Sequence, residues 1–279
     1  MQVSSIMTPN PAAVFRDTSL DEALALMDKH GIRHLPVLHE GTLVGILSDR
    51  DLLEATGWLP SRVHACRGPG FAEQGSRKVS EIMVGEPVEI RPVDSIATAS
   101  VEILERRIGC LPVVENGVLV GVLTEMDLLN AYVEGQLGEG PSAHASTPVS
   151  EHMTPAPLTI DWETTLGSAI EILSANGFRH LPVVEGGQLV GLVSDRDLRR
   201  AQGAGRHEEQ LIEELVTTEL VTVPADAGLA RAAEVMLQRK ISSLPVVQDG
   251  EFVGLLTLSD LLDHCLDEFR ARGESAARS

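Results

Sequence analysis

Apolar and polar positions alternate in a pattern that occurs four times along the 279 residues of the chain. In the first copy, the apolar positions of residues 20–27 have helical spacing, which predicts an amphipathic helix. Ser19 stands where an N-cap is expected, and Gly31 stands where such a helix ends. The first element of this copy with a clear period is therefore a helix of about three turns.

Short apolar runs surround this helix and predict strands. Residues 35–38 and 43–47 are separated by Glu40-Gly41, which is typical of a hairpin turn. Residues 12–14 predict a further short strand, and a second helix is expected to begin near Ser48. The predicted order is strand, helix, strand, strand, helix. One such α/β unit has a single sheet face and a small core, so we expect units to pair.

Three landmarks with fixed spacing define the repeat: Leu-Pro-Val, a glycine nine residues after its proline, and an aspartate six residues after the glycine. The prolines are Pro36, Pro112, Pro182 and Pro245. The glycines are Gly45, Gly121, Gly191 and Gly254. The aspartates are Asp51, Asp127, Asp197 and Asp260. Four units therefore align without a gap, over residues 6–51, 82–127, 152–197 and 215–260.

The first and third units (the odd units) resemble each other more than they resemble the second and fourth (the even units). Both odd units carry Arg-His before Leu-Pro and end in Ser-Asp-Arg-Asp, and both even units lack these features. A pair of units was thus duplicated, and each pair is a predicted domain, here called a module. The first module is predicted over 1–140, with units 1–57 and 79–133 and linker 58–78. The second is predicted over 141–279, with units 149–203 and 212–269.

Each unit closes with Ser/Thr-x-x-Asp at the start of its second helix. One interpretation is a capping box, in which hydroxyl and carboxylate satisfy the free backbone amides. The other is a ligand site, because a carboxylate at a helix N-terminus can accept from a sugar diol while the amides face a phosphate. The motif alone leaves both interpretations open.

The repeated Leu-Pro-Val and Gly-x-x-Ser/Thr-x-x-Asp motifs resemble cystathionine β-synthase (CBS) domains, over about four fifths of the chain. The resemblance implies an α/β fold in which paired units form Bateman modules, with clefts that commonly bind AMP, ADP, ATP or S-adenosylmethionine. It implies ribose and phosphate contacts for the closing motifs, and phosphate contacts for basic residues nearby. The implied nucleotide-binding residues are Arg33, His34, Ser48, Arg50, Asp51, Thr124, Asp127, Arg179, His180, Ser194, Arg196, Asp197, Thr257 and Asp260.

The even units depart from this pattern. Gly109-Cys110 and Ser242-Ser243 replace Arg-His, while Met126 and Ser259 replace Arg50 and Arg196. Arg107 and Lys240 lie two positions earlier and could partly compensate. We therefore expect one dominant site in each module.

Charge and composition narrow the function. The formal net charge of −19 disfavours nucleic acids and anionic membranes, so a phosphate ligand needs a few placed cations. Aromatic residues make up only 3% of the chain, which leaves little for base stacking. No apolar run is long enough for a membrane span, and no secretory signal is apparent, so a cytoplasmic location is expected. Cys66, Cys110 and Cys265 form no CxxC pair and are expected to be reduced thiols.

Three hypotheses follow. The first is a regulatory sensor of adenosine nucleotides that signals occupancy to a partner protein; the cations favour phosphorylated ligands over S-adenosylmethionine. The second is an interaction scaffold with empty clefts, in which the arginines merely pair with carboxylates. An enzyme is not expected, because no catalytic motif appears, and His64 with Cys66 is weak evidence for a metal site. The modules are expected to pack as a disc, within one chain or across a homodimer.

Overall fold

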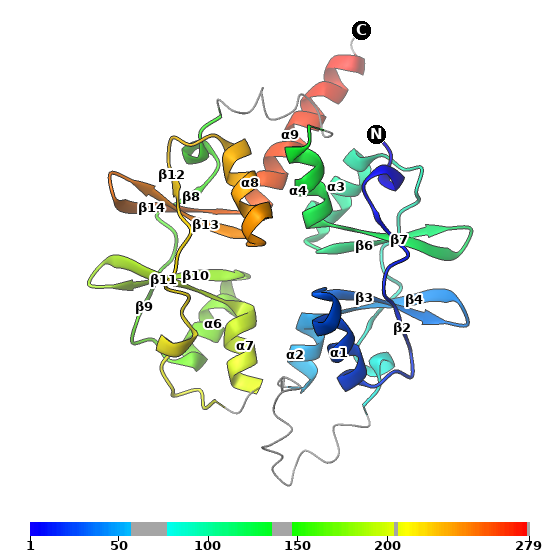
Figure 1. Ribbon diagram of the computed structural model, residues 1–279, viewed down its shortest axis with the longest axis horizontal. Coiled ribbons are helices and arrows are strands. Elements are labelled where there is room, and N and C mark those ends of the chain that lie inside the picture. Colours follow the sequence, from blue (N-terminus) through cyan, green and yellow to red (C-terminus); the bar gives the residue numbers. More distant parts are fainter. Residues whose placement is uncertain (57–76, 136–146, 204–205, 278–279) are drawn as a thin grey trace.

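The computed structural model describes residues 1–56, 77–135, 147–203 and 206–277. Four similar α/β units surround a common centre, with their hairpins pointing outward and their helices facing the midline (Figure 1). Each unit contains the predicted order of strand, helix, strand, strand, helix, and the first and third units begin with one additional two-residue strand. The two modules pack against each other within this single chain, since helices of one contact helices of the other.

The first module contains two units with matching elements. Unit 1 comprises β1 (Thr8–Pro9), β2 (Val14–Phe15), α1 (Leu20–His30), β3 (His34–His39), β4 (Thr42–Ser48) and α2 (Asp49–Thr56). Unit 2 comprises β5 (Val84–Gly85), α3 (Ile96–Arg106), β6 (Cys110–Glu115), β7 (Val118–Thr124) and α4 (Glu125–Val133). Single 3-10 turns, Val3–Ser5 and Val79–Glu81, precede the units. The first module therefore repeats one plan twice.

The second module follows the same plan. Unit 3 comprises β8 (Thr154–Pro155), β9 (Ile160–Asp161), α6 (Leu166–Asn176), β10 (His180–Glu185), β11 (Gln188–Ser194) and α7 (Asp195–Gly203). Unit 4 comprises β12 (Val223–Pro224), α8 (Leu229–Arg239), β13 (Ser243–Gln248), β14 (Glu251–Thr257) and α9 (Leu258–Ala277). The 3-10 turns Val149–Glu151 and Glu213–Leu215 precede them.

Local signals set the ends of the first helix in unit 1. Ser19 caps α1 in a reciprocal box with Glu22, and Gly31 ends the helix at a φ of +64°, which glycine adopts without a Cβ clash. Both ends agree with the prediction. The strand predicted at 12–14 instead covers Val14–Phe15, because only these residues pair with the neighbouring strand β3.

The two units of a module exchange the segments that begin them. In the first module, β1 of unit 1 pairs with β7 of unit 2, and β5 of unit 2 pairs with β4 of unit 1. In the second module, β8 pairs with β14, and an isolated bridge joins Thr217 to Leu192 of β11. We call these exchanged segments the crossing segments, residues 7–9, 83–85, 153–155 and 216–218. One edge of each unit's sheet, formed by β4, β7, β11 or β14, is thereby covered by the partner unit.

The exchange explains the glycine nine residues after each proline. At Gly45 an added Cβ would lie 2.7 Å from the sulfur of Met83, and at Gly121 it would lie 2.6 Å from the sulfur of Met7. Both methionines belong to the crossing segment of the partner unit. Only glycine leaves room for this close approach.

The buried core divides unevenly among the units. One continuous cluster joins units 2 and 4, from Ile103 and Leu129 to Leu244 and Leu262. Unit 1 has a separate core around Leu35 and Leu47, and unit 3 has another around Leu181 and Val193. The even units are thus fused across the predicted domain division, whereas the odd units are not. Among the described residues, no helix has both the length and the apolar character needed to cross a bilayer.

Candidate functional site

The closing motif of each unit forms a helix cap. In unit 1, Asp51 Oδ2 accepts hydrogen bonds from the backbone N (2.7 Å) and the Oγ (2.6 Å) of Ser48, while Asp51 N donates to Ser48 Oγ at 3.2 Å. Hydroxyl–carboxylate bonds of the same kind join Thr124 to Asp127, Ser194 to Asp197, and Thr257 to Asp260. The capping interpretation is therefore correct for one carboxylate oxygen, and Oδ1 takes part in none of these bonds.

Burial changes the pKa of both aspartates of the even units. Burial raises the pKa of Asp127 above its ordinary value, against hydrogen bonds from Thr124 and from Thr8 of the crossing segment. Burial likewise raises the pKa of Asp260, against the hydrogen bonds from Thr257 and the charge of His152. The carboxylate of Asp127 in unit 2 is thus hydrogen-bonded to the crossing segment of unit 1.

The aspartate of unit 3 opens onto a cleft. Asp197 lines a cavity of about 380 Å³ with Arg200 on the same helix and with Arg206, Glu214 and Thr217 from the segment that enters unit 4. Small-molecule sites commonly enclose about 300–1,000 Å³. The cleft therefore joins two carboxylates and two arginines in a space of ligand size, and Arg206 forms an ion pair with Glu214 there.

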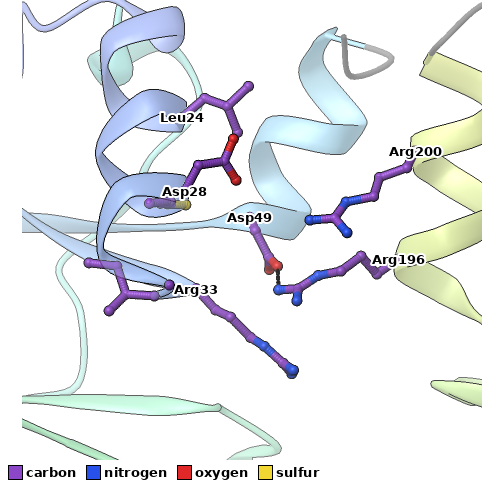
Figure 2. A pocket seen from close by; sticks show the side chains of 9 residues that line it. Leu24, Asp28, Arg33, Asp49, Arg196 and Arg200 are labelled. Atoms are coloured by element: carbon purple, nitrogen blue, oxygen red, sulfur yellow. Dashed lines mark hydrogen bonds and ion pairs between the residues drawn. The ribbon is translucent and has the colours of Figure 1, made fainter. Parts of the chain in front are cut away.

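Basic residues of the odd units meet at the centre of the molecule. Arg33 and Arg179 precede β3 and β10, and Arg196 lies in the first turn of α7. Arg33 and Arg196 line a second cavity of about 110 Å³ between α1, α2 and α7, together with Arg200 and Asp49 (Figure 2). Burial, then the charges of Arg33 and Arg200, lower the pKa of Arg196 to about 10, so it stays charged at neutral pH.

Carboxylates pair with most of these arginines. Arg196 forms an ion pair with Asp49, and Arg50 lies 3.9 Å from Asp195. Arg179 Nη1 lies 3.0 Å from Glu125 Oε2. Within the described part of the chain, the guanidinium of Arg33 makes no hydrogen bond and no ion pair, while its backbone carbonyl accepts a hydrogen bond from Asp49 N at 2.9 Å. The scaffold hypothesis, in which the arginines pair with carboxylates, therefore fits Arg50, Arg179 and Arg196, and these pairs join the two modules.

The two histidines are not cations in this state, contrary to expectation. Burial, and then the charges of Arg33 and Arg179, lower the pKa of His34 to about 4. The same causes lower the pKa of His180 to about 4. Both imidazoles are therefore neutral at pH 7 and would serve as hydrogen-bond donors rather than as positive charges.

The second unit makes room for one of these histidines. An added Cβ at Gly109 would lie 2.9 Å from the His34 ring, so the missing side chain at this position lets the ring pack across the unit boundary. Arg107 and Lys240 end α3 and α8 as left-handed C-caps with exposed side chains. Their position is that of helix caps, as for Gly31.

Several residues of this region escaped the motif-based prediction. Arg200 and Arg206 line the Asp197 cleft, and Asp49, Glu125 and Asp195 pair with the central arginines. The three acids occupy the same repeat position, directly after the Ser or Thr of the closing motif, and that regularity was the available signal. Among the described residues, no three His, Cys, Asp or Glu side chains gather as metal ligands. His64 and Cys66 lie outside the described residues.

Comparisons with known proteins agree with the repeat. The family model "CBS domain" matches four segments, residues 3–57, 79–134, 149–204 and 212–267. Protein MJ1225 of Methanocaldococcus jannaschii is 25% identical over 270 residues, covering 90% of this chain and 94% of that protein. Its crystal structure superimposes with a TM-score of 0.77 over 95% of this chain and 99% of that one, at 23% identity. CBS domain-containing protein YhcV of Bacillus subtilis is 32% identical over 114 residues, 40% of this chain and 81% of its own length.

Proposed function

The chain belongs to the CBS domain family, and we propose that it is a regulatory, non-catalytic sensor of adenosine nucleotides. AMP, ADP or ATP would bind in the clefts of the odd units, one in each module. Occupancy would change the arrangement of the modules, and a partner protein in the cytoplasm would respond to that change.

The observation that carries this proposal is the Asp197 cleft. It presents a carboxylate with an uncommitted Oδ1 beside the start of α7, and Arg200 and Arg206 line the same space. A ribose diol donates well to such a carboxylate, and phosphates are attracted to arginines and to a helix N-terminus. The aspartate selects the sugar in this proposal, and the arginines select the phosphates.

The central arginines extend the site toward the middle of the molecule. Arg33 has no ion pair within the described residues, and Arg179 and Arg196 hold carboxylates that a phosphate could replace. His34 and His180 would donate hydrogen bonds, and a nearby phosphate dianion would raise the pKa of both imidazoles. The even aspartates act in this proposal as structural caps.

A scaffold without a ligand remains the second candidate, favoured by one observation. Arg50, Arg179 and Arg196 already have carboxylate partners, so three of these charges are balanced within the chain. A scaffold would need no ligand to satisfy them.

Isothermal titration separates the two candidates. Protein stripped of nucleotide is titrated with ATP, AMP, adenosine and S-adenosylmethionine. We expect micromolar binding of ATP or AMP, and binding of adenosine weaker by at least about tenfold because it lacks the phosphates. Arg33→Gln/Arg179→Gln should reduce ATP binding to the adenosine level, whereas Arg107→Gln/Lys240→Gln, which removes the same charge at the surface, should not. Absence of binding by every ligand would favour the scaffold.

A further inference from the structure

The first residue of the second helix follows a rule across the repeat. This position holds Asp49 in α2, Glu125 in α4 and Asp195 in α7, and Leu258 in α9. An acid in the first turn of a helix is ordinarily explained by the helix dipole. In this chain, each of the three acids has a second partner.

Each of the three acids contacts an arginine of the opposite module. Asp49 and Glu125 of the first module pair with Arg196 and Arg179 of the second, and Asp195 of the second pairs with Arg50 of the first. We call these three contacts the inter-module ion pairs. Two of them are reciprocal, because Asp49 and Asp195, like Arg50 and Arg196, occupy equivalent positions in units 1 and 3.

Burial makes Asp49 and Glu125 dependent on these arginines, whereas Asp195 also pairs with Arg199 of its own helix at 2.7 Å. The side chains of Asp49, Asp195 and Glu125 are only 18%, 15% and 14% exposed. A half-buried carboxylate that loses its counterion is destabilised, so it must gain a new partner or move into solvent. Figure 2 shows Arg196 and Arg200 reaching from α7 toward Asp49, near the side chain of Arg33, which forms no ion pair within the described residues.

The even units meet each other through apolar side chains. Leu258 is buried in the cluster that joins units 2 and 4, and α4 packs on α8 and α9 there. The contact between α2 and α7 joins odd units whose cores are separate. Anions can therefore compete with the ion pairs between units 1 and 3, whereas the apolar cluster that joins units 2 and 4 contains no charged group for an anion to displace.

We propose that phosphate groups of a bound nucleotide displace Asp49, Asp195 and Glu125 from their arginines, and that the modules then separate at the odd units while staying joined at the even units. This proposal rests on the proposed function, because it needs a phosphorylated ligand near the central arginines, which are Arg33, Arg50, Arg179 and Arg196. It specifies how binding would change the shape of the molecule.

Distances between spin labels at equivalent repeat positions test the proposal. Lys29 and Ala175 report across the odd units, and Glu105 and Gln238 report across the even units; all four positions are exposed. Each pair is changed to cysteine in a Cys66→Ser background, where the remaining Cys110 and Cys265 are buried. With ATP, we expect the 29–175 distance to lengthen by roughly 2 Å or more while the 105–238 distance stays constant.

A charge-removal variant provides an independent measurement. Asp49→Asn/Glu125→Gln/Asp195→Asn should show the longer 29–175 distance without ATP, and it should bind ATP on the order of tenfold more tightly because the competing carboxylates are gone. The matched control is Asp21→Asn/Glu163→Gln/Asp226→Asn, which removes the same charge at exposed positions and should behave as the wild type.

The outcomes distinguish the two proposals. Calorimetric binding of ATP with an unchanged or shortened 29–175 distance would overturn the displacement proposal and leave the nucleotide sensor in place. Equal changes in both label pairs would also overturn it. No binding of ATP would overturn both. If the charge-removal variant does not fold, the ATP-dependent distances in the otherwise wild-type labelled protein still decide.

Discussion

The even units and the odd units meet across the same midline by different chemistry. Units 2 and 4 share one apolar cluster, in which Leu129 and Leu262 are at most 1% exposed. Units 1 and 3 keep separate cores and meet through α2 and α7, whose first turns exchange Asp–Arg pairs. Anions have little effect on apolar contacts. Anions weaken ion pairs, because they screen the charges or compete for the arginine. One repeated unit thus supplies both an apolar contact and an ionic contact, and our proposal assigns the response to a ligand to the ionic one.

Removing a large side chain from the apolar cluster that joins units 2 and 4 should have the largest effect on stability. Leu262 in α9 and Arg199 in α7 occupy the same repeat position. Leu262→Ala should cost about 2–5 kcal/mol of unfolding free energy, because it leaves a cavity in the shared core. Arg199→Ala should cost less than half of that, since it removes an ion pair with Asp195. Urea denaturation of the two variants makes the comparison, and equal losses would contradict an apolar joint confined to the even units.

Disturbing the exchange of crossing segments should destabilise an odd unit and an even unit equally. Gly45→Ala and Gly121→Ala each force a Cβ against a methionine of the partner unit, at 2.7 Å and 2.6 Å. We expect each to lower the free energy of unfolding by about 1–3 kcal/mol. Similar losses of unfolding free energy would show that the odd and even units differ in their helix contacts and not in their sheets. A loss confined to one variant would place part of the asymmetry in the sheet.

Salt should weaken only the odd contact. Asp49→Asn removes an ion pair whose side chains are 18% and 29% exposed, and it should cost about 1 kcal/mol at low ionic strength. The difference from wild type should shrink in 1 M NaCl, because screening already weakens the pair there. Thermal denaturation at both salt concentrations measures this. Asp21→Asn is the exposed control, and a salt-independent cost would argue against an ionic contribution.

The effect that is smallest at neutral pH comes from the two histidines of the odd units, and it grows as the pH falls. The pKa of His34 and of His180 is about 4 in the folded state, below the ordinary value of about 6.5. The folded protein therefore binds fewer protons, so stability falls as pH decreases from about 6.5 to 4. His34→Gln/His180→Gln should show a shallower fall over this window in urea denaturation at several pH values. An unchanged slope would contradict the low pKa values.

The sequence was sufficient for the fold because every unit repeats the same signals. Ser19, Gly31 and the hairpin at Glu40-Gly41 are local, and four copies in one register make chance agreement implausible. The segment exchange was not predictable, since a two-residue strand such as Thr8–Pro9 carries no information on its partner. Its trace was the glycine at fixed spacing, whose neighbour only the structure reveals.

The candidate site was predictable in part. The closing motif and the Arg-His positions led to Asp197, Arg33 and Arg179. Ion pairs such as Arg196 with Asp49 were not predictable, because 147 residues separate the partners and the acid also fits a helix N-terminus. The loss of charge on His34 and His180 depends on burial among arginines, which no local motif encodes.

Hydrogen exchange with and without ATP tests most directly whether the odd units bind the ligand. The backbone amides at the starts of α2 and α7 should become protected, in peptides near 45–56 and 191–203. The equivalent peptide of unit 4, near 254–266, should be unchanged, because Leu258 replaces the acid there and Ser242-Ser243 replaces Arg-His. Protection of this peptide instead, or of all three peptides equally, would contradict a ligand response confined to the odd units.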